Sequence, residues 1–355
     1  MKNGKLIISL VVLAALIGFG VWAYRHVGFD FATFKAQLAH VDWIKIAIGM
    51  GCIYLGYVLR SVRWAYLLRP NKRVPLLSLT GIQVIGFTSV ALVGRVADLT
   101  RPYMIAKKTG LTLSTQIAVY IVERLFDAGS MALIFSSVIL LAPPGALPHP
   151  ELFKKVGYWG LAGTAAGAIF LVMVRVAGGT VATFFEHTIG VLSKALGQAV
   201  GEKIRSFRTG LDTLRTPGDL AVTLAISLVN WGLISTAYIM TARAFTASPQ
   251  LANLTVAQGL VLMIVSGGAS ALQLPILGWF TQIGVVATAL SSFFGVGPES
   301  ATACAAMLLI VTFLAVVPAG LIWAQFEHVS LRKVASESEH AAEVEAPLTE
   351  EPTKA

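Results

Sequence analysis

The chain has 355 residues, of which 56% are hydrophobic and only 13% are charged. Soluble domains carry about 25% charged residues, so this composition excludes an ordinary soluble domain and indicates an all-α polytopic membrane protein. The formal net charge is +9 although six of the eighteen acidic residues crowd into the last twenty positions. The membrane body is therefore strongly basic, which fits cytoplasmic loops facing anionic lipid. We expect no nucleic-acid partner, because no basic stripe is interleaved with exposed aromatic residues.

The first two apolar segments predict a cytoplasmic N-terminus. Residues 6–23 follow Lys2 and Lys5, are long enough to span and lack a good signal-peptidase site, so we expect an uncleaved N-terminal anchor helix. A second span is predicted from Trp43 to Leu59. It is followed by the densest basic cluster of the chain, which contains Arg60, Arg63, Arg69, Lys72 and Arg73. The positive-inside rule places this cluster in the cytoplasm.

Residues 74–106 predict a re-entrant helical hairpin. Leu76 to Val93 is apolar and ends at Gly94, and two further lysines, Lys107 and Lys108, follow soon after. Because both flanks are basic and hence cytoplasmic, the segment between them must enter the membrane and return. Gly94 and Pro102 are its predicted structural turn residues.

The next segments carry charge at unusual depth. Ser114 to Ala142 predicts a span from inside to outside, with Glu123 roughly 13 Å and Asp127 roughly 20 Å along it. The two acids are four residues apart and share one helix face. Residues 157–176 form the following span. Residues 180–216 alternate basic and apolar positions and predict cytoplasmic amphipathic helices at the interface, the alternative being a solvated linker.

The second half repeats this pattern with the opposite orientation. Residues 220–242 span outward, residues 253–295 predict a second hairpin that enters from outside, and residues 300–325 form the last span inward. The expected structural turn residues of that hairpin are Gly267, Gly268 and Pro275. The prediction is therefore about six full transmembrane helices and two re-entrant hairpins in a single domain over residues 1–330, with eight or more full spans as the alternative. Residues 331–355 predict a disordered, acidic cytoplasmic tail.

The two halves together predict an inverted-topology repeat. Transporters built in this way commonly bind substrate near the membrane midplane, where broken helices from both repeats meet. The predicted substrate-binding side chains at that level are Arg95, Asp98, Arg101, Glu123, Arg124, Asp127, Gln273 and Gln282.

The charges at this level need a partner, water or a function, since burying one in hydrocarbon costs at least about 2.5 kcal/mol. The arginines suit a phosphate headgroup, which their planar fork binds through two hydrogen bonds. The acids could bind a cationic headgroup, take up a proton or neutralise the arginines. A purely structural alternative remains: Arg95 or Arg101 pairs with Glu123 or Asp127 to pin the hairpin to the next span. The two glutamines line a groove or bond between helices.

Other chemistry has little support in the sequence. All six histidines lie outside the confident spans, the two cysteines lie in apolar runs, and no phosphate-cradling glycine-rich loop occurs. We therefore expect no enzyme activity, no cofactor and no metal.

Three stretches resemble the lysylphosphatidylglycerol synthase transmembrane-region family, whose members are also called flippase-like. They are Gly94-Arg95-x-x-Asp98-x-x-Arg101-Pro102, Lys107-Lys108-Thr109-Gly110-Leu111-Thr112 and Val122-Glu123-Arg124-Leu125-Phe126-Asp127. A weaker likeness continues through Gln273-Leu274-Pro275 and Phe294-Gly295-Val296-Gly297-Pro298, and the resemblance covers roughly residues 40–330.

The resemblance implies a protein of the bacterial plasma (inner) membrane that translocates a lipid. In fused relatives this region moves aminoacylated phospholipid made by a synthase domain. Only about thirty residues follow the last span here, so we expect no synthase. The chain departs from the family at Ala97-Asp98, where Gly-Glu is usual, and it lacks an acid after the second turn and an arginine near Leu308.

The predicted function is that of a translocator of a phospholipid or lipid-linked intermediate. The alternative is a non-transporting scaffold or accessory protein for a lipid- or envelope-modifying enzyme. The expected partners are membrane lipids, with a lipid-modifying enzyme or a second copy of the chain as further candidates.

Overall fold

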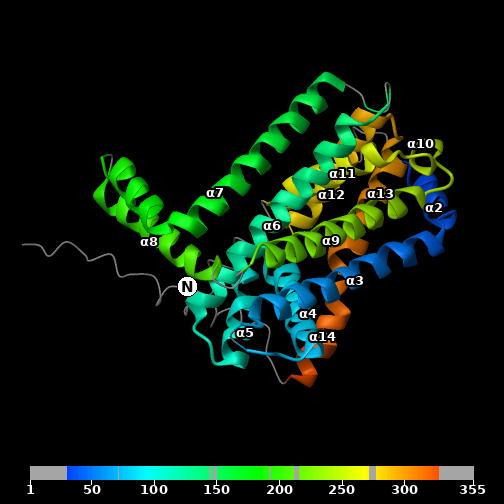
Figure 1. Cartoon of the computed structure of the whole chain (residues 1–355). Helices are drawn as coiled ribbons and strands as arrows, with labels where there is room; N and C mark the ends of the chain where they lie inside the picture. Colours follow the sequence, from blue (N-terminus) through cyan, green and yellow to red (C-terminus); the bar gives the residue numbers. More distant parts are fainter. Residues whose placement is uncertain are drawn as a thin grey trace, which may run out of the picture.

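A computed structural model describes residues 30–70, 72–143, 145, 147, 150–191, 193–211, 216–271 and 277–327. Within these ranges every regular element is a helix, and the β-type contact is an isolated bridge between Val41 and Phe245. Figure 1 shows the helices bundled side by side. The predicted anchor over residues 6–23, the tail over residues 331–355, Gln273 and Pro275 lie outside the described residues.

Each half of the chain contributes a set of long and short helices. The first half comprises α2 (Phe31–Ala39), α3 (Trp43–Leu68), α4 (Leu76–Val93), the 3-10 helix η1 (Arg95–Leu99), α5 (Thr100–Thr109), α6 (Leu113–Leu140), α7 (Pro150–Gly190) and α8 (Lys194–Leu211). The second half comprises α9 (Pro217–Arg243), α10 (Pro249–Ala252), α11 (Val256–Ala271), α12 (Leu277–Phe294), α13 (Pro298–Leu309), the π-helix η2 (Ile310–Leu314) and α14 (Val316–Phe326).

Length and apolarity make this a multi-pass membrane protein, as the composition predicts. Among the described residues four helical stretches are long and apolar enough to cross a membrane: α3, α4, α9 and the continuous run Pro298–Phe326. A fifth would be α7, whose parts Pro150–Phe170 and Val172–Gly190 are bent by 63°. With 28 residues, α6 is also long enough, at about 1.5 Å per residue, but it carries three charges near its middle.

Two antiparallel helices, α3 and α9, join the two halves. The backbone N–H of Asp42 donates to the carbonyl of Ala244 at one end (2.8 Å). At the other end the Tyr66 hydroxyl donates to Asp219 (2.6 Å). Between these points Gly56 allows a close approach, because a Cβ there would lie 3.0 Å from Asn230 Oδ1. The opposite directions predicted for these two segments are confirmed.

The last span packs against α4 through small residues and an irregular turn. A Cβ on Gly320 would collide with the Thr88 side chain, so only glycine permits this contact. In the π-helix the Ala315 N–H bonds to the Ile310 carbonyl (2.7 Å), and the wider turn leaves carbonyls available to other donors. The Tyr54 hydroxyl bonds the Ala315 carbonyl (2.6 Å), and Thr88 Oγ1 bonds the Val316 carbonyl (3.2 Å).

The bundle has one basic end. Figure 1 shows α5 and the end of α14 at one end, and α2 and α10 at the other. At the first end Lys108 pairs with Glu327 (2.9 Å) and Lys72 Nζ donates to the Thr109 carbonyl (2.6 Å).

Helix boundaries correct one sequence prediction with consequences for function. The second span was expected to end at Leu59, but α3 continues to Leu68. Arg60 and Arg63, which we expected to follow the span as part of a basic cluster, instead lie on the helix itself and are only 7% and 1% exposed inside the bundle. Hydropathy ends a span at the first charges, whereas ion pairing with another helix allows this one to continue.

The predicted turns are partly confirmed. Gly94 does separate α4 from η1, and its φ of 96° favours glycine. Pro102 instead lies in the first turn of α5, where its missing N–H breaks no helix bond. Gly267 and Gly268 lie inside α11 rather than in a turn, since glycine is tolerated within membrane helices. The predicted amphipathic segment over residues 180–216 contains the end of α7 as well as α8.

The contact between α14 and α4 can be tested with a single methyl group. In a helix Gly→Ala is normally stabilising by about 1 kcal/mol. We expect Gly320→Ala to lower the melting temperature instead, because its Cβ meets Thr88. Gly163→Ala on α7 is the matched control, since nothing lies within 4 Å of its Cβ, and it should not lower that temperature. Thermal unfolding in detergent measures both; equal behaviour would contradict the packing.

Candidate functional site

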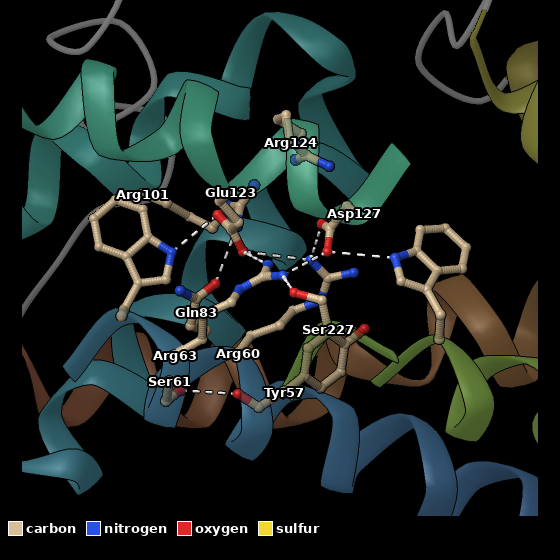
Figure 2. A network of polar contacts seen from close by, with 12 residues as sticks. Tyr57, Arg60, Ser61, Arg63, Gln83, Arg101, Glu123, Arg124, Asp127 and Ser227 are labelled. Carbon is tan, nitrogen blue, oxygen red and sulfur yellow. Dashed lines mark hydrogen bonds and ion pairs between the residues drawn. The ribbon is translucent and has the colours of Figure 1, made fainter. Parts of the chain in front are cut away.

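Two buried carboxylates on α6 organise the centre of the bundle. Glu123 and Asp127 are 0% and 3% exposed and lie one helical turn apart on one face. Arg60 and Arg63 are three residues apart on α3 and face them. Figure 2 shows the two guanidinium groups lying between the two carboxylates. Spacings of three and four residues both keep side chains on one helix face, so each arginine pairs with both carboxylates.

Glu123 accepts four hydrogen bonds from side chains of α3 and α5. Its Oε1 accepts from Arg63 Nη2 (2.6 Å) and Arg60 Nη1 (3.4 Å). Its Oε2 accepts from the Trp64 indole (2.9 Å) and from Arg101 Nη1 (3.3 Å). A carboxylate has about four lone-pair sites, so this one is fully engaged within the protein.

Asp127 is held in a similar way, and it extends the network to α9. Its Oδ2 accepts from Arg60 Nη1 (2.8 Å), and its Oδ1 accepts from Arg63 Nη1 (2.7 Å) and the Trp231 indole (3.3 Å). Arg63 Nη1 also donates to Ser227 Oγ on α9 (2.6 Å). The second half of the chain is thus tied to the network through neutral groups.

Arg101 connects α4 and α5 to the same network. Its Nη1 also donates to Gln83 Oε1 on α4 (3.1 Å), and its guanidinium lies 4.5 Å from the centre of the Phe87 ring. A Cβ at Gly86 would collide with the Arg101 side chain, so this glycine makes room for it. The structural role suggested for Arg101, pinning the hairpin to the next span, agrees with these contacts.

A second, more accessible layer lies beside the buried network. Asp98 in η1 pairs with Arg124 Nη2 on α6 (3.3 Å), and Arg101 Nη2 lies 4.0 Å from the same carboxylate. The side chains of Arg124 and Asp98 are 34% and 19% exposed. Taken together, the described members of both layers are four arginines and three carboxylates, which leaves one positive charge in excess.

This second layer forms part of the wall of a cavity of about 220 Å³ between the two halves. The charged residues in its wall, Arg60, Asp98 and Arg124, all come from the first half. The second half contributes polar but uncharged side chains, namely Asn230, Ser270, Gln282 and Thr312. The cavity is too small for a whole lipid but large enough for a headgroup.

The predicted site residues separate into two groups. Arg101, Glu123 and Asp127 belong to the buried network and are absent from the cavity wall, while Asp98, Arg124 and Gln282 line the cavity. The side chain of Arg95, like Gln273, lies outside the described part of the protein.

Sequence reasoning missed several members of the site: Arg60, Arg63, Trp64, Ser227, Asn230 and Trp231. The two arginines had a readable signal, because their spacing complements that of the two acids on α6. The uncharged residues of α9 had none, since single polar residues are common in membrane helices.

The described residues contain no cluster of three or more histidine, cysteine or acidic side chains that could hold a metal. The arginine and amide side chains in the cavity wall can take part in ionic and hydrogen-bonding contacts.

These features define a class: a multi-pass helical membrane protein whose halves enclose a polar cavity beside a buried ionic network. The family model for the lysylphosphatidylglycerol synthase TM region matches residues 6–320, and the chain belongs to this family. The match also includes the predicted N-terminal anchor segment. No curated protein and no solved structure shows significant similarity to the chain.

Because Arg63 is buried and paired with two carboxylates, we expect its replacement to destabilise the protein more than replacement of an exposed arginine. Arg63→Gln leaves two buried carboxylates short of a charge partner, which typically costs about 3–5 kcal/mol, so we expect a large fall in melting temperature. Arg69→Gln is the control six residues further along, because the Arg69 side chain is 58% exposed, and it should leave the melting temperature unchanged. Similar effects of both changes would refute the network.

Proposed function

We propose that this protein translocates a phospholipid or lipid-linked intermediate across the bacterial inner membrane, with both termini in the cytoplasm. The observation that carries the proposal is the cavity between the two halves, with Arg60, Asp98 and Arg124 in its wall. A translocator needs such a polar surface for the headgroup while the acyl chains stay in lipid. Membership of the family supports the proposal.

The two layers suit different tasks. The buried network satisfies its own charges, so it can hold α3, α5, α6 and α9 together without a ligand. Arg124 and Asp98 are exposed enough to exchange their mutual ion pair for contacts with a headgroup. Arginine is suited to a phosphate, because its planar donors match phosphate oxygens. No bond needs to be made or broken in the lipid, and we propose transport rather than enzymatic chemistry.

Transport is tested by reconstituting the purified protein in liposomes that contain a fluorescent phospholipid or a polyprenyl phosphate. We expect faster transbilayer movement of at least one of these lipids than in protein-free liposomes. Arg124→Gln should reduce that rate at least tenfold, because the headgroup loses its charged contact, a loss worth about 1.5–3 kcal/mol. Arg69→Gln should keep the rate.

The melting temperature of Arg124→Gln must also be measured, since it separates lost recognition from lost folding. If none of these lipids moves faster than in protein-free liposomes, the transport function is wrong.

One observation favours the alternative, a non-transporting scaffold for a lipid- or envelope-modifying enzyme. The carboxylates of Glu123 and Asp127 are bonded on both oxygens within the protein, as in a purely structural core. In addition, α8 presents the exposed bases Lys194 and Arg208. In that case Lys194→Glu with Arg208→Glu should abolish copurification of a partner, while Arg124→Gln should change stability alone.

A further inference from the structure

Two amide side chains from the second half of the chain line the cavity and have polar atoms without hydrogen-bond partners among the described residues. Asn230 on α9 is 1% exposed, and neither its Oδ1 nor its Nδ2 has a hydrogen-bond partner among the described residues. An unpaired buried polar group costs about 1–3 kcal/mol, so the side chain is expected to serve a ligand or water. Asn230 lines the cavity, so its Oδ1 can accept a hydrogen bond from a ligand and its Nδ2 can donate one.

A second amide, Gln282 on α12, offers a fixed acceptor to the same cavity. Its Nε2 donates to Ser266 Oγ (2.8 Å), and Ser266 in turn accepts from the Tyr238 hydroxyl (2.8 Å). These bonds leave Gln282 Oε1 unpartnered, although the residue is only 3% exposed. A buried acceptor of this kind is satisfied by a hydroxyl or N–H of a ligand.

The carboxylates in and behind the cavity are already committed. Asp98 is paired with Arg124, while Glu123 and Asp127 are occupied by arginines and tryptophans. A headgroup that ends in an ammonium would therefore find no unpaired carboxylate among the described residues of the cavity wall. The excess positive charge and the unpartnered Arg124 Nε favour an anion instead.

We infer that the cavity binds an anionic lipid headgroup in which the phosphate is followed by an uncharged polyol or sugar. The phosphate lies against Arg124, and the hydroxyl groups bond Asn230 and Gln282. This inference rests on the proposed function for its setting, since it names the substrate class of the same cavity. It also gives the two halves distinct roles: the first half binds the charged phosphate, and the second half binds the hydroxyl groups.

Lipid competition measures this preference directly. The purified full chain is incubated with equal amounts of phosphatidylglycerol, phosphatidic acid and phosphatidylethanolamine with identical acyl chains, and the retained lipids are counted by native mass spectrometry. Phosphatidylglycerol should be retained roughly threefold to tenfold above each of the others, the effect of one or two added hydrogen bonds.

Three variants assign the preference to the amides. Asn230→Leu keeps the branched shape of the side chain, and Gln282→Leu shortens it by one methylene. Both remove the amide and should bring phosphatidylglycerol down to the level of phosphatidic acid, whose own retention stays unchanged. Gln116→Leu is the matched control, because Gln116 is also 0% exposed with both amide atoms unpartnered yet is not in the cavity wall. It should keep the preference.

The outcomes separate this inference from the proposed function. Equal retention of the three lipids by the wild type, a preference for phosphatidylethanolamine, or an equal loss in Gln116→Leu would overturn it. Movement of all three lipids at one rate in liposomes would also overturn it while leaving translocation intact. Selective retention of phosphatidylglycerol without movement would support the headgroup class and refute translocation.

Discussion

The ion pairs between α3 and α6 are the interaction on which the rest of the structure depends. Two carboxylates and two arginines are withdrawn from water together. The carboxylates accept further hydrogen bonds from Arg101 and two indoles, and Arg63 donates to Ser227. Removing one member leaves an uncompensated charge, which is far costlier than removing an apolar contact. The positions of α5 and α9 follow, because each supplies a donor that this core requires.

The cavity is asymmetric, because its charged residues come from the half of the chain that contains this core. Arg60, Asp98 and Arg124 of the first half face it from one side, and Arg60 belongs to both the network and the wall. The second half packs against α3 and α6 but contributes amides and hydroxyls. The ionic network thus holds the helices in place, and a ligand would be recognised by the polar groups that are not bonded within it.

The sequence was informative about elements and less so about contacts. Apolar runs located α3, α4, α6, α9 and the last span, and the glycine with positive φ at position 94 was placed correctly. Arg60 and Arg63 were misassigned, because charge rules treat arginine as solvated unless a partner is known. Gly267 and Gly268 were also misassigned. Adjacent glycines usually indicate a turn in a soluble protein, but within a membrane helix they are tolerated without breaking it.

The charge on α6 also has a consequence for how the chain enters the membrane. A helix with three charged residues near its middle is poorly inserted alone, since each costs about 2.5–3.5 kcal/mol on insertion scales. The arginines of α3 are synthesised first and the acids of α6 later. Stable insertion of α6 therefore depends on α3 remaining nearby, so that biogenesis of the first half becomes a single cooperative event rather than a series of independent helix insertions.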